Sequence, residues 1–176
     1  RIACRFSLLF IPVACLVTRS FQSFAIIPAA GQSRRMATPK LLLQLRGRRL
    51  IEIVLEAWIA SRVDHVAVVV KENDAQLADY CRRAGVDVVL PARDLARHYS
   101  PRDNDAWLVA PADLPGLTKD VIDSLLENYR PHMPMAVTPV VEGKRAHPVL
   151  FPWRLAAEVS QLPPDAGVNR LIRAAE

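Results

Sequence analysis

The chain has 176 residues, a length at which we expect one domain with a sizeable hydrophobic core. Its 51% hydrophobic and 23% charged residues exclude a disordered chain, and its 6% aromatic content argues against a stacking platform for single-stranded nucleic acid. The formal net charge of +5 is unevenly placed, since residues 1–51 contain nine basic side chains and no acidic one, whereas the rest carries a net charge of −4. This placement disfavours a protein that binds polyanions over its whole surface.

Cysteine usage and the first apolar segment bear on the location of the protein. The three cysteines form no CxxC motif and have no histidine at ligand spacing, which argues against a disulfide scaffold or structural zinc and favours a reducing cytoplasm. Residues 6–17 are almost wholly apolar but too few for a membrane span, which needs about 20 residues. We expect residues 1–23 to be a leader or extension outside the fold. The alternative is a targeting signal, because Ser23-Phe24-Ala25 has the small-x-small pattern of a cleavage site.

From residue 24 onward, short apolar runs alternate with segments of helical periodicity. In chain order we predict a strand at 24–29, a helix at 50–61, a strand at 65–70, a helix at 73–83, strands at 86–90 and 106–110, a helix capped by Thr118 and running to about 129, a strand at 135–141, and helices at 153–161 and 167–175. The first helix has one apolar stripe, formed by Leu50, Ile51, Val54, Leu55, Trp58 and Ile59. Asn73 is the expected cap of the second helix, and Gly85 closes it.

Continuous Val, Ile and Leu strands separated by helices predict a mostly parallel sheet covered on both faces. With right-handed crossovers this gives a three-layer α/β/α sandwich. Ligands of such sheets bind beyond the carboxyl ends of the strands. The two loops that matter most are therefore residues 30–40, after the first strand, and residues 111–117, after the strand at 106–110.

The loop after the first strand is small and then basic. It reads Ala-Ala-Gly-Gln-Ser-Arg-Arg-Met-Ala-Thr-Pro-Lys over residues 29–40. Small residues let the backbone approach a ligand, their N–H groups can form an anion-binding nest, and the cations from Arg34 to Arg49 form or follow this loop. It is neither a Walker A loop nor a GxGxxG fingerprint. On composition alone, a solvated basic turn is the alternative interpretation.

The motif Gly31-x-Ser33-x-Arg35-Met36-x-x-Pro39-Lys40, preceded by Ile-Ile-Pro-Ala-Ala, resembles the signature loop of the MobA-like NTP transferases. This group includes the molybdenum-cofactor cytidylyl- and guanylyltransferases. Residues 109–115 resemble its "ADMP" segment, residues 145–151 its "GHPV-F" stretch with Ala for Gly, and residues 165–171 its "GD-G-A-R-L" turn. An isoprenoid-pathway cytidylyltransferase shares the style of the first loop, but the later motifs favour the molybdenum-cofactor side.

The resemblance implies a Rossmann-like sheet of the nucleotide-diphospho-sugar transferase type and a Mg²⁺-dependent nucleotidyltransferase. Such an enzyme moves a nucleoside monophosphate from CTP or GTP to a phosphorylated acceptor, here molybdopterin or molybdenum cofactor, and releases pyrophosphate. The resemblance makes Arg35, Lys40 and Asp113 catalytic, with Asp113 as the metal ligand. It makes the following residues nucleotide-binding: Ala29, Ala30, Gly31, Gln32, Ser33 and Arg34. It places Arg145, His147 and Asp165 near the acceptor. Structural alternatives stay open: a turn or cap for Asp113 and Asp165, packing on a strand for His147, and surface charge for Arg145.

Two departures from the family pattern qualify this interpretation. The family typically has a Gly-Met-x-x-Ser segment and a helix where only residues 91–105 stand here, barely enough for a parallel crossover between neighbouring strands. The family's Asp/Asn-Thr-Pro-Glu-Asp-like segment is also missing, so we expect residues 24–176 to be a C-terminally truncated domain. The alternatives are an inactive nucleotide-binding relative and a cytidylyltransferase for another phosphorylated small molecule. A nucleic-acid-binding module is disfavoured, because the basic groups cluster at one loop, and neither a nucleic-acid partner nor a stable membrane span is expected.

Overall fold

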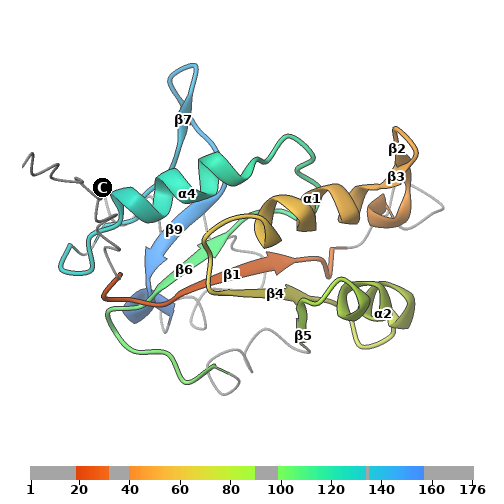
Figure 1. Cartoon of the computed structure of the whole chain (residues 1–176), viewed down its shortest axis with the longest axis horizontal. Helices are drawn as coiled ribbons and strands as arrows, with labels where there is room; N and C mark the ends of the chain where they lie inside the picture. The colour runs from red at the N-terminus through yellow and green to blue at the C-terminus, as the bar shows by residue number, and fades with distance from the viewer. Residues whose placement is uncertain (1–18, 32–39, 90–98, 134, 157–176) are drawn as a thin grey trace, which may run out of the picture.

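A five-stranded sheet organises the computed structural model, which describes residues 19–31, 40–89, 99–133 and 135–156 (Figure 1). The strands lie in the order β5-β4-β1-β6-β9, and all pair in parallel except β9, which is antiparallel to β6. Their bounds are Ser23–Pro28 for β1, His65–Val69 for β4, Asp87–Val89 for β5, Ala106–Val109 for β6 and Val149–Pro152 for β9. The predicted mostly parallel sheet is confirmed, and its four parallel strands differ from the predicted ranges by at most one residue at each end.

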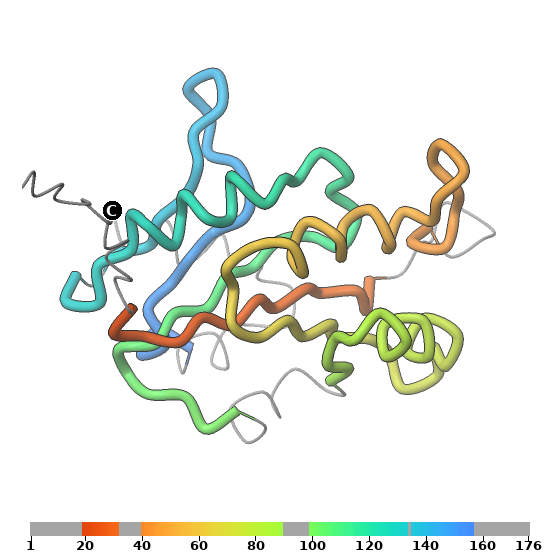
Figure 2. Tube along the Cα trace, viewed as in Figure 1, coloured from red at the N-terminus to blue at the C-terminus, as the bar shows by residue number. Residues whose placement is uncertain are grey.

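Three helices pack against one face of this sheet. They are α1 (Leu50–Ile59), α2 (Ala75–Arg83) and α4 (Lys119–Asn128). Figure 2 shows the chain passing from β1 through α1 to β4, and then through α2 to β5. Both crossovers step in the same direction along the sheet, so right-handed connections place α1 and α2 on the same face. Trp58 of α1, Cys81 of α2 and Leu126 of α4 accordingly share one buried cluster with the strands.

The opposite face of the sheet has a second apolar cluster, which contains Phe24, Trp107 and Phe151. In the described part of the chain, Tyr99 and the short 3₁₀ helix η3 (Trp153–Leu155) pack against it. A continuous apolar strand is what a sheet covered on both faces requires. The two clusters therefore confirm that the predicted sheet is buried on both sides.

Several predicted elements are corrected by the structure. Helix α2 begins at Ala75, so its cap is Asp74, whose carboxylate accepts the Leu77 N–H at 3.2 Å, and not Asn73. Thr118 stands at the cap of α4 as predicted, but its hydroxyl makes no capping hydrogen bond. Ile59, expected on the buried stripe of α1, is 51% exposed because the helix ends there.

The predicted strand at 135–141 is wrong over most of its length. Only Val137 bridges to Leu150, and the short strand β7 (Val140–Val141) turns away to pair with β8 (Lys144–Arg145) in a projecting hairpin (Figure 1). Pro139 has no N–H to donate to a ladder, which separates the two pairings. The predicted helix at 153–161 is 3₁₀ over Trp153–Leu155, and the remainder, like the predicted helix at 167–175, lies outside the described residues.

Five residues before the expected start of the domain at residue 24 already contact it. The Arg19 guanidinium lies 3.2 Å from the Asp64 carboxylate, and Phe21 is buried edge-on against Tyr129. The Gln22 N–H donates to the Asp105 carboxylate at 2.8 Å. Residues 19–23, which belong to the predicted extension, thus make contacts with the sheet and with the elements packed on it. The rest of the predicted leader, residues 1–18, lies outside the described residues. Among the helices that the structure describes, none is long and apolar enough to cross a bilayer.

Candidate functional site

The site lies where the strand order reverses. From β1 the chain steps to β4 and β5 on one side, and then returns to β6 on the other side of β1. Strands β5 and β6 are consequently not neighbours, so the connection between them does not join adjacent strands. The carboxyl ends of β1 and β6 lie side by side at this switch point, which is where ligands of open α/β sheets bind.

The loops that follow these two strands line one cavity of about 310 Å³. Pro28, Ala29 and Gly31 come from the loop after β1, and Pro111, Ala112 and Asp113 come from the loop after β6; Lys40 and Leu41 complete the lining. The two loops predicted from the sequence therefore meet. The apolar wall residues Leu41 and Pro111 were not predicted, since nothing in their chemistry distinguishes them from ordinary loop residues.

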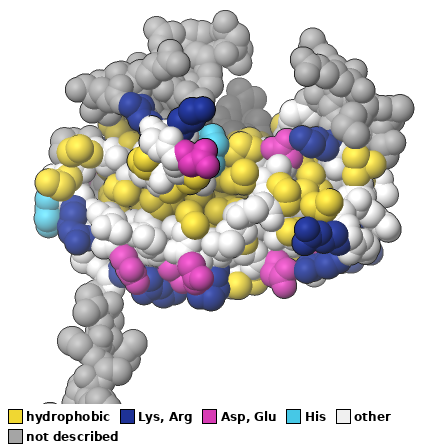
Figure 3. All heavy atoms as spheres, turned by 90° about the horizontal axis from the view of Figure 1, so that it is seen from above, with side chains coloured by type: hydrophobic (Ala, Val, Ile, Leu, Met, Phe, Trp, Pro, Cys, Tyr) yellow, Lys and Arg dark blue, Asp and Glu magenta, His cyan; other side chains and the backbone are white. Residues whose placement is uncertain are grey.

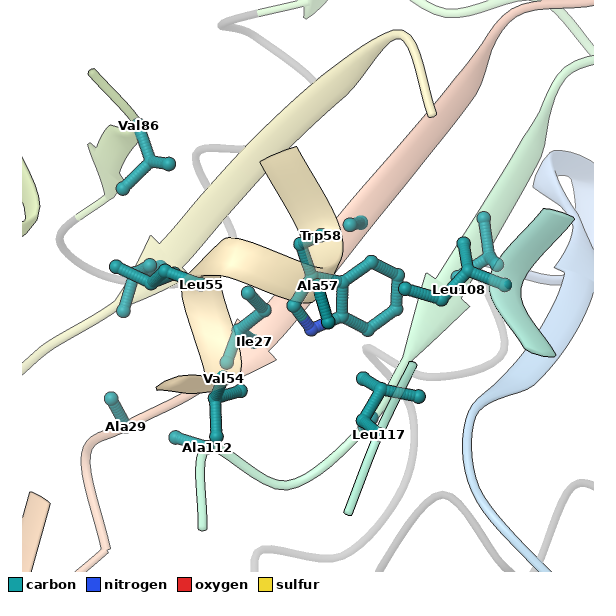
Figure 4. Close-up of a cluster of buried hydrophobic side chains, with 14 of the residues drawn as sticks. Ile27, Ala29, Val54, Leu55, Ala57, Trp58, Val86, Leu108, Ala112 and Leu117 are labelled. Atoms are coloured by element: carbon teal, nitrogen blue, oxygen red, sulfur yellow. The ribbon is translucent and has the colours of Figure 1, made fainter. Parts of the chain in front are cut away.

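The cavity wall is anchored in the core by two alanines. Ala29 and Ala112 are 8% and 3% exposed, and they belong to the cluster formed by α1, α2, α4 and the sheet (Figure 4). The Ala29 N–H donates to the Val69 carbonyl at 2.8 Å. Because this amide pairs within the sheet, it is not free to donate to an anion. Ala30 and Gly31 lie beyond this last ladder hydrogen bond.

Gly31 leaves open space where a side chain would stand. A Cβ built at this position meets no atom of the described residues within 4 Å, and its φ is not in the positive range that favours glycine. The fold therefore does not require glycine here. By contrast, Gly47 has a φ of +79° in the turn between β2 (Gln44–Leu45) and β3 (Arg48–Arg49). If Gly31 has a role, it is toward a ligand that approaches the backbone.

Lys40 and Asp113 form an ion pair across the mouth of the cavity. The Lys40 Nζ lies 2.6 Å from the Asp113 Oδ2, and their side chains are 47% and 39% exposed. Lys40 opens the 3₁₀ helix η1 (Lys40–Leu42), and the Leu43 N–H donates to its carbonyl at 3.2 Å. Leu41 and Leu42 pack on the core, which fixes the backbone from which the Lys40 side chain extends to Asp113. The two predicted catalytic residues that the structure describes are thus in contact.

Arg48 and Arg49, which follow Lys40 in the sequence, lie at a different part of the surface. The Arg48 guanidinium donates to the Glu56 carboxylate at 2.8 Å, and this hydrogen bond raises the pKa of Arg48. Arg49 lies over the Tyr80 ring, 4.9 Å from its centroid. The hydroxyl of Tyr80 donates to Glu52, which lowers the pKa of that carboxyl. Arg48 and Arg49 therefore bind groups of α1 and α2, not the cavity.

His147 lies at the same edge of the sheet as Asp113. Because β9 is antiparallel to β6, Val149 at its start pairs with Val109 at the end of β6. His147 precedes that start, and its Nδ1 is buried without a hydrogen-bond partner in the described part of the chain. Arg145 stands on the exposed β8 hairpin strand. His147 is close to the cavity in topology but does not line it.

A metal ligand set is only partly present in the described residues. Asp113 offers a half-exposed carboxylate, a hard ligand of the kind that Mg²⁺ prefers. Within the described ranges, no group of three or more His, Cys, Asp or Glu side chains could hold a metal ion. One carboxylate completed by phosphate oxygens and water fits Mg²⁺, which is commonly bound in that way. The predicted site residues Gln32, Ser33, Arg34, Arg35 and Asp165 lie outside the described residues.

The face of the molecule that Figure 3 shows combines apolar and charged side chains. In Figure 3, hydrophobic side chains gather in the middle of the face, and basic and acidic side chains surround them. The exposed apolar residues include Val140 and Val141 of the β7 strand, at 65% and 59% exposure. This face differs from a uniformly basic surface, which agrees with the uneven charge of the sequence.

Known proteins are similar to this chain in sequence. Residues 25–176 match the family model described as MobA-like NTP transferase domain. A probable molybdenum cofactor guanylyltransferase of Natranaerobius thermophilus is 28% identical over 128 residues, which cover 68% of this chain and 60% of that protein. The alignment thus spans less than two thirds of this relative. Nicotine blue oxidoreductase of Paenarthrobacter nicotinovorans is 30% identical over 169 residues, covering 84% of this chain and 80% of that protein.

Solved structures share the fold. The crystal structure of Rv0371c from Mycobacterium tuberculosis H37Rv superimposes with a TM-score of 0.73 at 21% identity, covering 90% of this chain and 85% of that one. The structure of Rv0371C in complex with manganese gives a TM-score of 0.68 at 21% identity, over 86% of this chain and 82% of that one. These likenesses confirm the Rossmann-like arrangement of a mostly parallel sheet with flanking helices.

Proposed function

Because the chain belongs to the MobA-like NTP transferase family, we propose that it moves a nucleoside monophosphate from CTP or GTP to a phosphorylated small molecule and releases pyrophosphate. The observation that carries this proposal is the cavity at the switch point, where a cation and a carboxylate meet between the loops after β1 and β6. For the acceptor we favour molybdopterin or molybdenum cofactor, because one relative is named a probable molybdenum cofactor guanylyltransferase.

In the proposed reaction the acceptor attacks the nucleotide directly, and no covalent intermediate with the protein is formed. An oxygen of the acceptor phosphate attacks the α-phosphorus, the bond from that phosphorus to the oxygen bridging to the β-phosphate breaks, and pyrophosphate leaves. Both reactants are anions, so catalysis depends on positioning and on charge neutralisation. We propose that Lys40, which lines the cavity, neutralises the triphosphate, and that a ligand approaches the backbone closely at Gly31. Arg35 belongs to the same motif and is proposed for the same role.

Asp113 is the residue that we propose to hold a divalent metal, with Mg²⁺ as the physiological ion. When bound, such an ion neutralises charge that develops on the leaving pyrophosphate. The related Rv0371C structure contains manganese, which supports a divalent ion for this fold family. For the acceptor side we propose His147, Arg145 and Asp165. Cysteine usage leads us to propose a cytoplasmic location.

A nucleotide-binding relative without transferase activity is the second candidate. It is favoured by the similarity to a protein that is named an oxidoreductase and not a transferase, at 30% identity over 84% of this chain. Both candidates bind a nucleotide at the cavity. Only the first one releases pyrophosphate.

Titration calorimetry with CTP, GTP and ATP in the presence of Mg²⁺ tests the nucleotide site directly. We expect CTP or GTP to bind, and Lys40→Met, which keeps the unbranched stem but removes the charge, to weaken binding far more at low salt than at high salt. Equal affinity of parent and variant at low ionic strength would contradict the role of Lys40. Lys119→Met, on the first turn of α4, is the matched control for loss of one surface charge.

Pyrophosphate release separates the two candidate functions. With molybdopterin as acceptor, we expect release from CTP or GTP that depends on Mg²⁺ and falls in Asp113→Asn. Nucleotide binding without any release, with molybdopterin and with other phosphorylated acceptors, would favour the second candidate. Unchanged metal-dependent release by Asp113→Asn would refute the metal role of this carboxylate.

A further inference from the structure

The ion pair between Lys40 and Asp113 joins two residues that the proposed function assigns to different partners. Lys40 is proposed to bind the triphosphate and Asp113 a divalent cation, yet in this chain the Lys40 ammonium lies 2.6 Å from the Asp113 Oδ2. The contact connects loops 73 residues apart in sequence, across the mouth of the cavity. While it persists, one oxygen of Asp113 accepts from an ammonium and is not available to a metal ion.

We propose that the Lys40–Asp113 contact is a latch that keeps Asp113 from binding a divalent cation until a triphosphate draws Lys40 away. This inference rests on the proposed function, because it concerns the same site. It predicts an order of events: the nucleotide-free chain takes up little metal, and metal and triphosphate bind together.

Two features of the described residues support the latch. First, Asp113 belongs to no group of three or more His, Cys, Asp or Glu side chains that could hold a metal ion within the described ranges, so a cation gains little from the protein alone. Second, a divalent ion at the remaining oxygen of Asp113 would stand close to the Lys40 ammonium and be repelled by it. A triphosphate removes both obstacles, since it offers the ammonium an anionic partner and supplies further oxygen ligands.

The exposure of the pair makes such a latch reversible. Both side chains are between one third and one half exposed, and ion pairs at that exposure are weak and readily exchanged. Leu41 and Leu42 hold the 3₁₀ helix on the core, so the long Lys40 side chain can change partner without a change in the backbone. A fully buried pair would resist separation, because each charge would lose its partner in a dry environment.

The test measures Mn²⁺ binding to the nucleotide-free protein by the electron paramagnetic resonance signal of the free ion. We expect Lys40→Met to bind Mn²⁺ roughly three- to tenfold more tightly than the parent, because the competing charge is gone. The double variant Lys40→Met/Asp113→Asn should lose this gain. Lys71→Met removes the same charge just after β4, at the same edge of the sheet, and should change Mn²⁺ affinity less than twofold. A non-hydrolysable CTP or GTP analogue should raise the Mn²⁺ affinity of the parent.

Three results would overturn the latch: an unchanged or weaker Mn²⁺ affinity in Lys40→Met, a gain that survives in the double variant, or an equal gain in Lys71→Met. Lys40→Gln, which keeps a polar end, provides a second variant with the same expectation. Failure of the latch is distinguishable from failure of the proposed function. If the parent binds the nucleotide analogue with Mn²⁺ but Lys40→Met shows no gain, only the latch is refuted. If the parent binds no nucleotide with Mn²⁺, the proposed function itself is refuted.

Discussion

Replacing Gly31 by alanine separates the needs of the fold from the needs of a ligand. A Cβ at this position meets no atom within 4 Å in the part of the chain that the structure describes, and the backbone is not in the left-handed region, so we expect the fold to tolerate alanine. Loss of glycine flexibility in the unfolded chain should then raise the free energy of unfolding by about 0.4–1 kcal/mol. The melting temperature should rise by roughly 1–3 °C.

The same methyl group should weaken nucleotide binding, because Gly31 lines the cavity. If a triphosphate contacts this backbone, an extra methyl group costs about 1–3 kcal/mol of overpacking, or roughly 5- to 150-fold in affinity. Thermal unfolding and calorimetry with CTP and GTP measure the two effects on one sample. Gly47→Ala is the control: its φ of +79° makes alanine cost about 1 kcal/mol of stability, with nucleotide affinity unchanged. Unchanged nucleotide affinity in Gly31→Ala would refute the close approach of the ligand.

Two further predictions concern buried polar groups. Burial alone would raise the pKa of Asp105, but hydrogen bonds, chiefly from Arg102, outweigh burial and hold the pKa below its ordinary value. The ionised carboxylate therefore stabilises the folded state fully above about pH 4, and this stabilisation is lost as the pH falls through the lowered pKa. Asp105→Asn should therefore lower the free energy of unfolding at pH 7 by about 3 kcal/mol and flatten its decline toward pH 3 in urea titrations; an equal decline in both proteins would contradict this account. Trp107→Phe should cost about 1 kcal/mol more stability than Trp58→Phe, because Trp107 Nε1 donates to the Pro152 carbonyl at 3.1 Å, whereas Trp58 Nε1 is buried without a partner in the described residues. Equal losses in denaturant unfolding would contradict this ranking.

The central strands could be predicted from the sequence because both faces of the sheet are apolar. In β1, Ala25 and Ile27 belong to the cluster under the helices, while Phe24 and Ile26 belong to the cluster on the other face. Such a strand is a continuous apolar run, which is recognisable without knowledge of its neighbours. The edge strand β9 was not predicted as a strand, and it depends on pairing with β6, some 40 positions earlier.

The site could be predicted to the level of loops but not of contacts. The rule that ligands bind at the carboxyl ends of parallel strands brings the loops after β1 and β6 together, and the structure confirms it. The pairing of Lys40 with Asp113 follows from the position of η1 and from the reach of one side chain. Neither can be read from motif spacing. The consumption of the Ala29 amide by Val69 likewise depends on strand register, which the sequence pattern leaves open.

The segment before Glu52 has no acidic residues in sequence, but in the structure three of its basic residues lie next to acidic residues from later in the chain. Within the described residues, Arg19 meets Asp64, Lys40 meets Asp113 and Arg48 meets Glu56, so each of these cations finds an acid from later in the chain. The pairs of Arg19 and Arg48 lie away from the cavity and neutralise charge locally. Only the pair of Lys40 lies at the cavity, and it is the pair that a triphosphate would have to divide. We therefore propose that the basic segment contributes to anion binding through its first loop, whereas the charges of Arg19 and Arg48 are neutralised by acidic residues of the fold.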